Sequence, residues 1–198
     1  MRFAITGELG FIGTNLAKTI QDMGYDFVSL LEKGLDHIDT GEPCVYNNTE
    51  KEWEHILADE KIDVLIHNAA VVGTDVVALN SEFSTLSNVM GTHTIARAAN
   101  KVGVPVCYTG TTVIYDTKKY QNAPITEKSL LNPKTFYGIQ KLAAEQIIKH
   151  NCSEWMIVRP LFAYGGHGDM NSLIAKTLYS HLTDVNSLDM FLDPTKIK

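Results

Sequence analysis

The sequence is poor in cysteine and has no long apolar run. Its three cysteines, Cys44, Cys107 and Cys152, are widely spaced among 198 residues and suggest neither a disulfide framework nor a zinc site. No apolar stretch approaches the roughly 18 residues of a membrane-spanning helix. The N-terminus is typical of a strand and lacks the pattern of a signal peptide. We therefore expect a cytoplasmic protein without a membrane segment or a bound metal.

An excess of positive charge is also missing. Lysine and arginine number 17 against 23 acidic residues, which gives a formal net charge of -6. A protein with a net negative charge does not favour nucleic acid or anionic membranes as partners. The hydrophobic share of 44% is enough for one globular domain with a sizeable core.

Short apolar runs alternate with longer amphipathic stretches along most of the chain. Such alternation is typical of an α/β fold, a doubly wound parallel sheet of the Rossmann type with strand order 3-2-1-4-5-6. A dinucleotide-binding domain is predicted at 1–167, and 168–198 is predicted to begin an incomplete, truncated substrate region with one helix at 169–182. We expect strands at 2–6, 26–31, 44–46, 64–67, 104–108 and 155–158, and helices at 11–23, 49–60, 78–101 and 135–150.

Three glycines follow the first predicted strand directly. Gly7, Gly10 and Gly13 have the spacing G-x-x-G-x-x-G and precede an apolar helix. The first allows a tight turn, the second lets backbone approach a phosphate, and the third permits close packing of the helix. The pattern predicts a pyrophosphate site at the start of the helix.

Glu32 ends the second predicted strand, where a carboxylate can accept the ribose hydroxyls of adenosine. This favours NAD over NADP, whereas the adjacent Lys33 could instead bind a 2′-phosphate. After the fourth strand, the small residues Ala69 and Ala70 leave room for a cofactor. His67, just before them, is interpreted as a capping or core residue.

Tyr137 and Lys141 lie four residues apart on a predicted helix and share one face. Lys141 and a positively charged oxidised nicotinamide can together lower the pKa of the Tyr137 phenol, and Lys141 can also bond the nicotinamide ribose. Thr111 follows the fifth predicted strand, where its hydroxyl could hold a substrate hydroxyl. The three residues predict an oxidoreductase site with Tyr137 as the base.

Taken together, these motifs resemble the extended short-chain dehydrogenases, in particular the NAD-dependent epimerase/dehydratase family that acts on nucleotide sugars. The resemblance implies cofactor contacts from Phe11, Ile12 and Asn88, the catalytic group Thr111, Tyr137 and Lys141, and a homodimer formed through helices 78–101 and 135–150. The matching segments are Thr6-Gly7-x-x-Gly10-Phe11-Ile12-Gly13, His67-Asn68-Ala69-Ala70, Asn88-Val89-Met90-Gly91-Thr92, Tyr137-x-x-x-Lys141 and Arg159-Pro160-Leu161-Phe162-Ala163-Tyr164-Gly165.

Several positions depart from that pattern. Thr112 and Val113 replace the Asp-Glu pair of the 4,6-dehydratases, so no acid is placed to expel a hydroxyl. Asp116 replaces a glycine, and Asn47-Asn48 replaces Gly-Asp near the adenine site. Family members also continue well beyond a chain of this length.

The leading hypothesis is an NAD-dependent nucleotide-sugar epimerase or a related decarboxylase. The alternatives are an NADP-dependent nucleotide-sugar reductase and a cofactor-binding domain that does not turn over by itself.

Overall fold

The computed structural model describes residues 1–30, 48–116, 118–119, 123–161 and 163. The chain divides into two compact units, Met1–Leu161 and Phe162–Lys198, and the described residues belong almost entirely to the first. Glu32, Lys33, the predicted strand at 44–46 and the predicted helix at 169–182 lie outside the described residues. The domain boundary after residue 167 stays a prediction.

Five parallel strands form one sheet in the order β2-β1-β3-β4-β5. With the strand predicted at 44–46 counted as third along the chain, this is the 2-1-4-5-6 part of the predicted order. The α/β fold is therefore confirmed over the described strands. They are β1 Arg2–Thr6, β2 Asp26–Leu30, β3 Val64–His67, β4 Val106–Thr109 and β5 Trp155–Val158.

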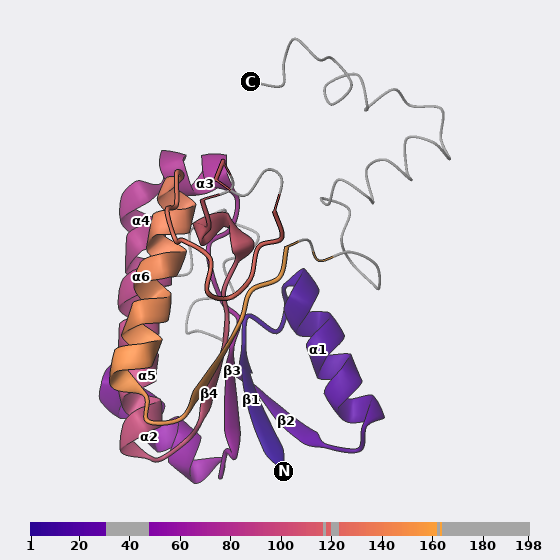
Figure 1. Ribbon diagram of the computed structural model, residues 1–198. Helices are drawn as coiled ribbons and strands as arrows, with labels where there is room; N and C mark the ends of the chain where they lie inside the picture. Colours follow the sequence, from indigo (N-terminus) through magenta and orange to yellow (C-terminus); the bar gives the residue numbers. More distant parts are fainter. Residues whose placement is uncertain (31–47, 117, 120–122, 162, 164–198) are drawn as a thin grey trace, which may run out of the picture. The chain divides into compact units, whose positions relative to one another are not determined.

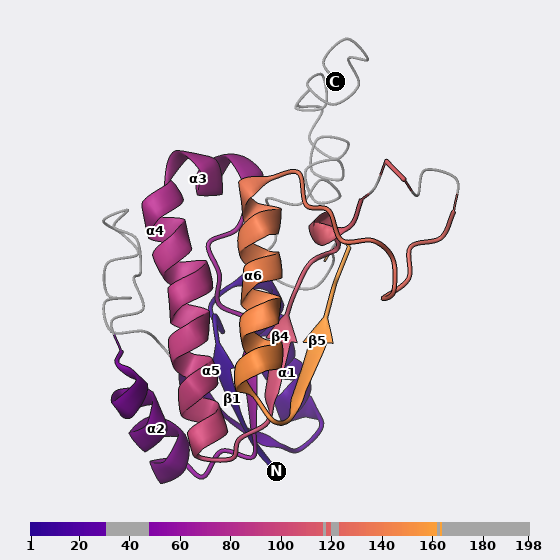
Figure 2. The same cartoon turned by 60° about the vertical axis from the view of Figure 1, so that its left-hand side comes forward.

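Helices cover both faces of the sheet (Figure 1). On one face α1, Phe11–Asp22, packs Ala17 and Ile20 against Ile5 of β1. On the other face lie α2 Glu50–Asp59, α5 Thr92–Lys101 and α6 Phe136–Asn151, side by side in both views (Figure 2). The main core lies beneath these three helices and includes Trp53, Leu65, Ile95, Val106, Ala144 and Ile148.

The predicted helix at 78–101 is not one regular helix. It begins earlier as α3, Thr74–Leu79, breaks at Asn80 and resumes as α4, Ser81–Thr85. It then widens into the π-helical segment η2, Leu86–Gly91, before α5. Asn80 has φ -119° and ψ 51°, outside the helical region. Periodicity does not reveal such a widened turn, which in other proteins often marks a functional site.

The smaller boundary differences have local causes. Helix α2 begins after Thr49, whose hydroxyl accepts from the Glu52 amide while the Glu52 carboxylate accepts from the Thr49 amide. Helix α6 likewise begins after Thr135, which accepts from the Gly138 amide. Strand β4 begins at Val106 rather than at Val104, the predicted start.

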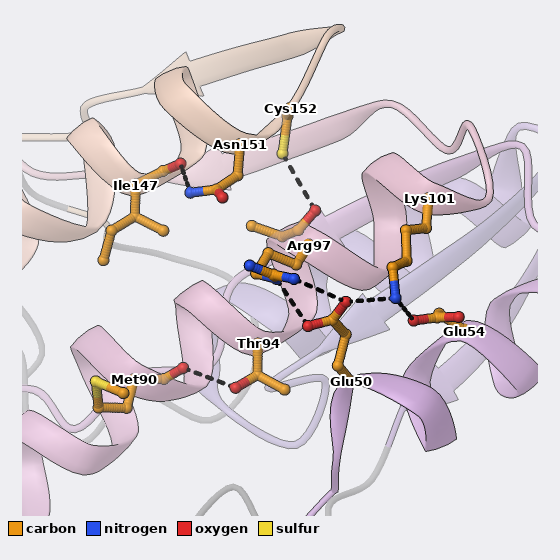
Figure 3. Close-up of polar contacts among 10 residues, drawn as sticks. Glu50, Glu54, Met90, Thr94, Arg97, Lys101, Ile147, Asn151 and Cys152 are labelled. Carbon is orange, nitrogen blue, oxygen red and sulfur yellow. Dashed lines mark hydrogen bonds and ion pairs between the residues drawn. The ribbon is translucent and has the colours of Figure 1, made fainter.

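Ion pairs join α2 to α5 at the surface (Figure 3). The Glu50 carboxylate is 2.7 Å from both Arg97 Nε and Lys101 Nζ, and Lys101 Nζ also reaches Glu54 Oε1 at 2.7 Å. These contacts hold the pKa of Glu50 below and that of Lys101 above their ordinary values. Because such pairs are exposed, they orient the helices more than they stabilise them.

Within the described part of the chain, no helix is long and apolar enough to span a bilayer. The same residues contain no group of three or more His, Cys, Asp or Glu side chains arranged to hold a metal ion.

Candidate functional site

The candidate site lies at the carboxyl ends of the central strands. Thr6, His67 and Thr109 are the last residues of β1, β3 and β4, which are parallel neighbours in the sheet. Ligands of open α/β sheets bind at this edge. The glycine turn, the His67-Asn68-Ala69-Ala70 segment and the Thr111 turn all begin there.

The glycine turn is tightly packed against the protein. A Cβ on Gly13 would lie 2.1 Å from the Gly7 carbonyl oxygen, and one on Gly7 would lie 2.7 Å from Ala69 Cα. Gly7 also has φ +69°, which favours glycine. At Gly10 the nearest atom to an added Cβ is 3.3 Å away, and no side chain caps α1 at this residue. The turn is therefore closed toward the protein and leaves the α1 N-terminus available to an anion.

Phe11 and Ile12 form the first turn of α1 and are half-buried. Ala69 and Ala70 are also half-buried, and Ala69 donates its amide to the Thr6 hydroxyl at 3.1 Å. The structure thus brings four of the predicted cofactor residues to one edge. Their contacts with a cofactor stay predictions, as does the role of Glu32, which lies outside the described residues.

His67 joins this edge to the helices behind it. Thr6 Oγ1 accepts from the amides of Asn68 and Ala69, so its hydrogen points to His67 Nδ1 at 2.8 Å. His67 Nε2 then donates to Thr92 Oγ1 at 3.0 Å, because the Thr92 hydroxyl donates to the Asn88 carbonyl. Burial lowers the pKa of His67 to about 3, with a smaller contribution from Lys141. The imidazole is a neutral core residue, as predicted.

Lys141 is 2% exposed and lies among groups that fix its position. Its Nζ donates to the Thr109 carbonyl at 2.7 Å and lies 4.3 Å from the centre of the Tyr108 ring. Burial lowers the pKa of Lys141 to about 7, and Glu145 acts against this shift. At neutral pH the amine is therefore close to half protonated.

Tyr137 stands one turn before Lys141 on α6 and is half-buried. In the chain without a cofactor, burial raises the pKa of Tyr137 above its ordinary value. The predicted lowering requires a bound oxidised nicotinamide as well as Lys141, so it stays a prediction. The phenol is thus held in its protonated form.

Thr111 is buried and begins the short helix η3, Thr112–Ile114, where its hydroxyl accepts from the Val113 amide at 3.3 Å. This turn packs on the start of α6, since a Cβ on Gly138 would lie 3.2 Å from the Val113 carbonyl oxygen. The structure therefore brings the Thr111 turn and the Tyr137 turn together. The catalytic role of Thr111 stays a prediction.

Asn88 is 1% exposed, and its amide group contacts protein atoms. Its Oδ1 accepts from the Val71 amide at 2.7 Å, and its Nδ2 donates to the Val71 carbonyl and to Gln140 Oε1. Gln140 Nε2 in turn donates to Ser84 and Thr85. These contacts favour a positioning role for Asn88 over the predicted cofactor contact. Gln140 was not predicted, although it lies between Tyr137 and Lys141.

A second buried network was also missed. Glu145 is 0% exposed and accepts two hydrogen bonds from Arg159, at 2.9 and 2.7 Å. Arg159 also donates to the Tyr115 hydroxyl at 2.6 Å, and its pKa is raised above the ordinary value by Glu145 first. The network joins α6, the end of β5 and the segment after η3. Glu145 lies four residues after Lys141, so the helical period could have indicated it.

Comparison with known proteins gives related sequences of low identity. A spore coat polysaccharide biosynthesis protein, SpsK, of Bacillus subtilis is 25% identical over 167 residues, which cover 84% of this chain and 54% of the relative. A dTDP-4-dehydrorhamnose reductase of Salmonella typhimurium is 24% identical over 98% of this chain and 60% of its own length. The chain thus spans about half to three-fifths of these relatives.

Solved structures share the fold. A dTDP-4-dehydrorhamnose reductase of Bacillus anthracis in complex with NADP has a TM-score of 0.73 and 23% identity over 90% of this chain and 59% of that one. The Bordetella bronchiseptica enzyme WbmG in complex with NAD has the same score and identity over 93% and 60%. The epimerase/dehydratase assignment is not confirmed. Residues 1–196 match the family described as the RmlD substrate binding domain, and the chain belongs to this family within the short-chain dehydrogenase-like superfamily.

Proposed function

We propose that the chain carries the cofactor site and the proton-donating residues of a nicotinamide-dependent reductase that acts on a keto group of a nucleotide sugar. Its family and the reductases among its relatives support a reductase more than they support an epimerase. The observation that carries the proposal is the state of Tyr137, whose pKa burial raises while its helix packs on the Thr111 turn.

Reduction of a ketone requires a proton on the carbonyl oxygen. A tyrosine phenol is protonated at neutral pH and can give that proton to the carbonyl oxygen, and burial favours this protonated form further. A bound reduced nicotinamide would supply the hydride. Lys141, with a pKa of about 7, is able to return a proton to the phenol afterwards.

The remaining residues hold the cofactor and orient the segments beside it. Gly7, Gly10 and Gly13 form the seat for the pyrophosphate at the start of α1. Thr6 and His67 fix the segment that contains Ala69 and Ala70, and Asn88 fixes Val71 just beyond it. The two segments together leave one edge of the sheet open to a nicotinamide dinucleotide.

Substitution of Tyr137 by phenylalanine tests the chemistry. With a dTDP-4-dehydro sugar and NADH or NADPH, we expect Tyr137→Phe to lower the rate of nicotinamide oxidation by at least about 100-fold, the usual size of a lost proton donor. Cofactor affinity measured by calorimetry should stay within about twofold, because the ring keeps its packing. A Tyr137→Phe protein with full activity would refute the proposed role.

A second candidate is a cofactor-binding domain without turnover of its own, since the chain spans only 60% of the Salmonella reductase. For such a domain, calorimetry should show binding of NAD or NADP and much weaker binding of UDP- and dTDP-sugars. Micromolar binding of a nucleotide sugar together with turnover would exclude this candidate.

A further inference from the structure

The glycine turn carries one acidic side chain that the site described above does not use. Glu8 follows Gly7, and its main chain is fixed because Thr14 Oγ1 donates to its carbonyl at 3.0 Å. Its side chain extends toward the neighbouring strand, where Ser29 Oγ donates to Glu8 Oε2 at 2.7 Å. Ser29 is the last residue but one of β2. The carboxylate is therefore held between the turn and the carboxyl end of β2.

This location coincides with the expected position of the adenosine ribose. When the pyrophosphate rests on the start of α1, the adenosine half extends across the end of the neighbouring strand, which here is β2. Glu8 joins the two elements that border the ribose. It is half-buried, so water screens its charge less than it screens a fully exposed carboxylate.

The two dinucleotides differ at this ribose by one group. NAD has a 2′-hydroxyl, which can donate to a carboxylate, whereas NADP has a 2′-phosphate with a charge of about -2 that a carboxylate repels. Within the described ranges, no lysine or arginine lies within ion-pair distance of Glu8 to offset its charge. The one lysine of nearby α1, Lys18, does not offset the charge of Glu8, because Lys18 pairs with Asp22.

We propose that Glu8 is a specificity-determining residue that selects the nicotinamide dinucleotide without a 2′-phosphate. The inference rests on the proposed function, since it requires that a dinucleotide occupies the glycine turn. It does not depend on Glu32, and it assigns the selection to a residue of the turn itself. The other explanation is that Glu8 only braces the turn against β2 through Ser29.

Substitution of Glu8 by glutamine separates the two explanations. Glutamine keeps a carbonyl oxygen that accepts from Ser29 and removes only the charge, so the brace remains. The dissociation constants of NAD and NADP should be measured by calorimetry for the native chain and for Glu8→Gln. The pair 5′-AMP and 2′,5′-ADP provides non-reactive probes of the same ribose. The control is Asp59→Asn, which removes an equal charge at an exposed residue at the end of α2.

We expect the native chain to bind NAD at least about tenfold more tightly than NADP, or about 1.4 kcal/mol. Glu8→Gln should tighten NADP and 2′,5′-ADP by about tenfold and change NAD by less than about twofold. Asp59→Asn should leave unchanged both the NAD to NADP ratio and the 5′-AMP to 2′,5′-ADP ratio of dissociation constants. A native preference for NADP, or an unchanged ratio in Glu8→Gln, would overturn the role of Glu8 alone. If the native chain bound neither dinucleotide, the proposed function itself would fail.

Discussion

At the scale of single residues, His67 shows how a titratable group becomes a structural one. Both of its ring nitrogens meet threonine hydroxyls, and each threonine is fixed by further bonds to the main chain. No other protonation state satisfies this set, because a second ring proton would face the hydrogen of Thr6. The network therefore depends on a neutral ring.

This network predicts acid sensitivity. Because the pKa of His67 is about 3 in the folded chain and near 6.5 in the unfolded chain, only the unfolded chain binds the proton between these values. The free energy of unfolding should fall as pH drops from about 6.5 toward 3. We expect His67→Gln to cost about 1–3 kcal/mol at pH 7 and to reduce this pH dependence.

Urea unfolding at a series of pH values measures both effects. His55→Gln is the matched control, because His55 is exposed on α2. An identical acid slope in the native protein and in His67→Gln would show that other groups cause the loss of stability.

At the scale of elements, α6 carries both the site and its supports. Lys141 donates to the last residue of β4, Gln140 bonds to α4 and η2, and Glu145 bonds to Arg159. The contacts of Gln140 reach the widened turn that holds Asn88. The helix that bears the proposed proton donor is thus tied to the segment expected beside the cofactor.

Gln140→Ala should therefore destabilise the protein. It leaves Asn88 Nδ2 without its Gln140 partner and removes the donor to Ser84 and Thr85. We expect a loss of about 1–3 kcal/mol in the free energy of unfolding by urea. Gln146→Ala, at an exposed position of the same helix, should change it by less than about 0.5 kcal/mol. Equal effects of the two variants would contradict the role of Gln140.

Residue patterns predicted the elements better than the contacts between them. The pattern of apolar and turn residues predicted β1, α1, β3 and β5, because apolar runs and the residues that end them can be read directly from the sequence. The widened turn at η2 was not predictable in this way, because it accompanies side-chain bonds from Asn88 to a residue 17 positions earlier. The same holds for Tyr137, whose pKa follows from burial rather than from the lysine beside it.

At the scale of the whole molecule, exposed apolar side chains lie on α3, η2 and α6. Leu79 is 85% exposed, and Leu86, Met90 and Ile139 are between 42% and 51% exposed. Ile95, which lies in the predicted interface helix 78–101, is instead buried in the core. A surface of this kind commonly marks an interface, and we propose that it joins two copies of the chain.

Light scattering tests this proposal at micromolar concentration. We expect a dimer for the native chain and a monomer for the double variant Leu86→Glu with Met90→Glu, because two buried carboxylates are costly at an interface. Met23→Glu changes an exposed residue at the end of α1 and should leave the dimer intact. A native monomer would remove the proposal.

The position of β1 between β2 and β3 also affects how the sheet folds during synthesis. It is synthesised before the other strands of this sheet, yet one of its partners, β3, pairs Thr6 with His67 across 61 residues of chain. The strand pairs that the structure describes are all parallel and separated by crossovers, so this sheet cannot grow from a hairpin. Such non-local pairing slows folding. During synthesis β1 should therefore stay unpaired until its distant neighbours have been made or a chaperone binds it. Its apolar run Phe3-Ala4-Ile5 is then exposed and prone to misassembly.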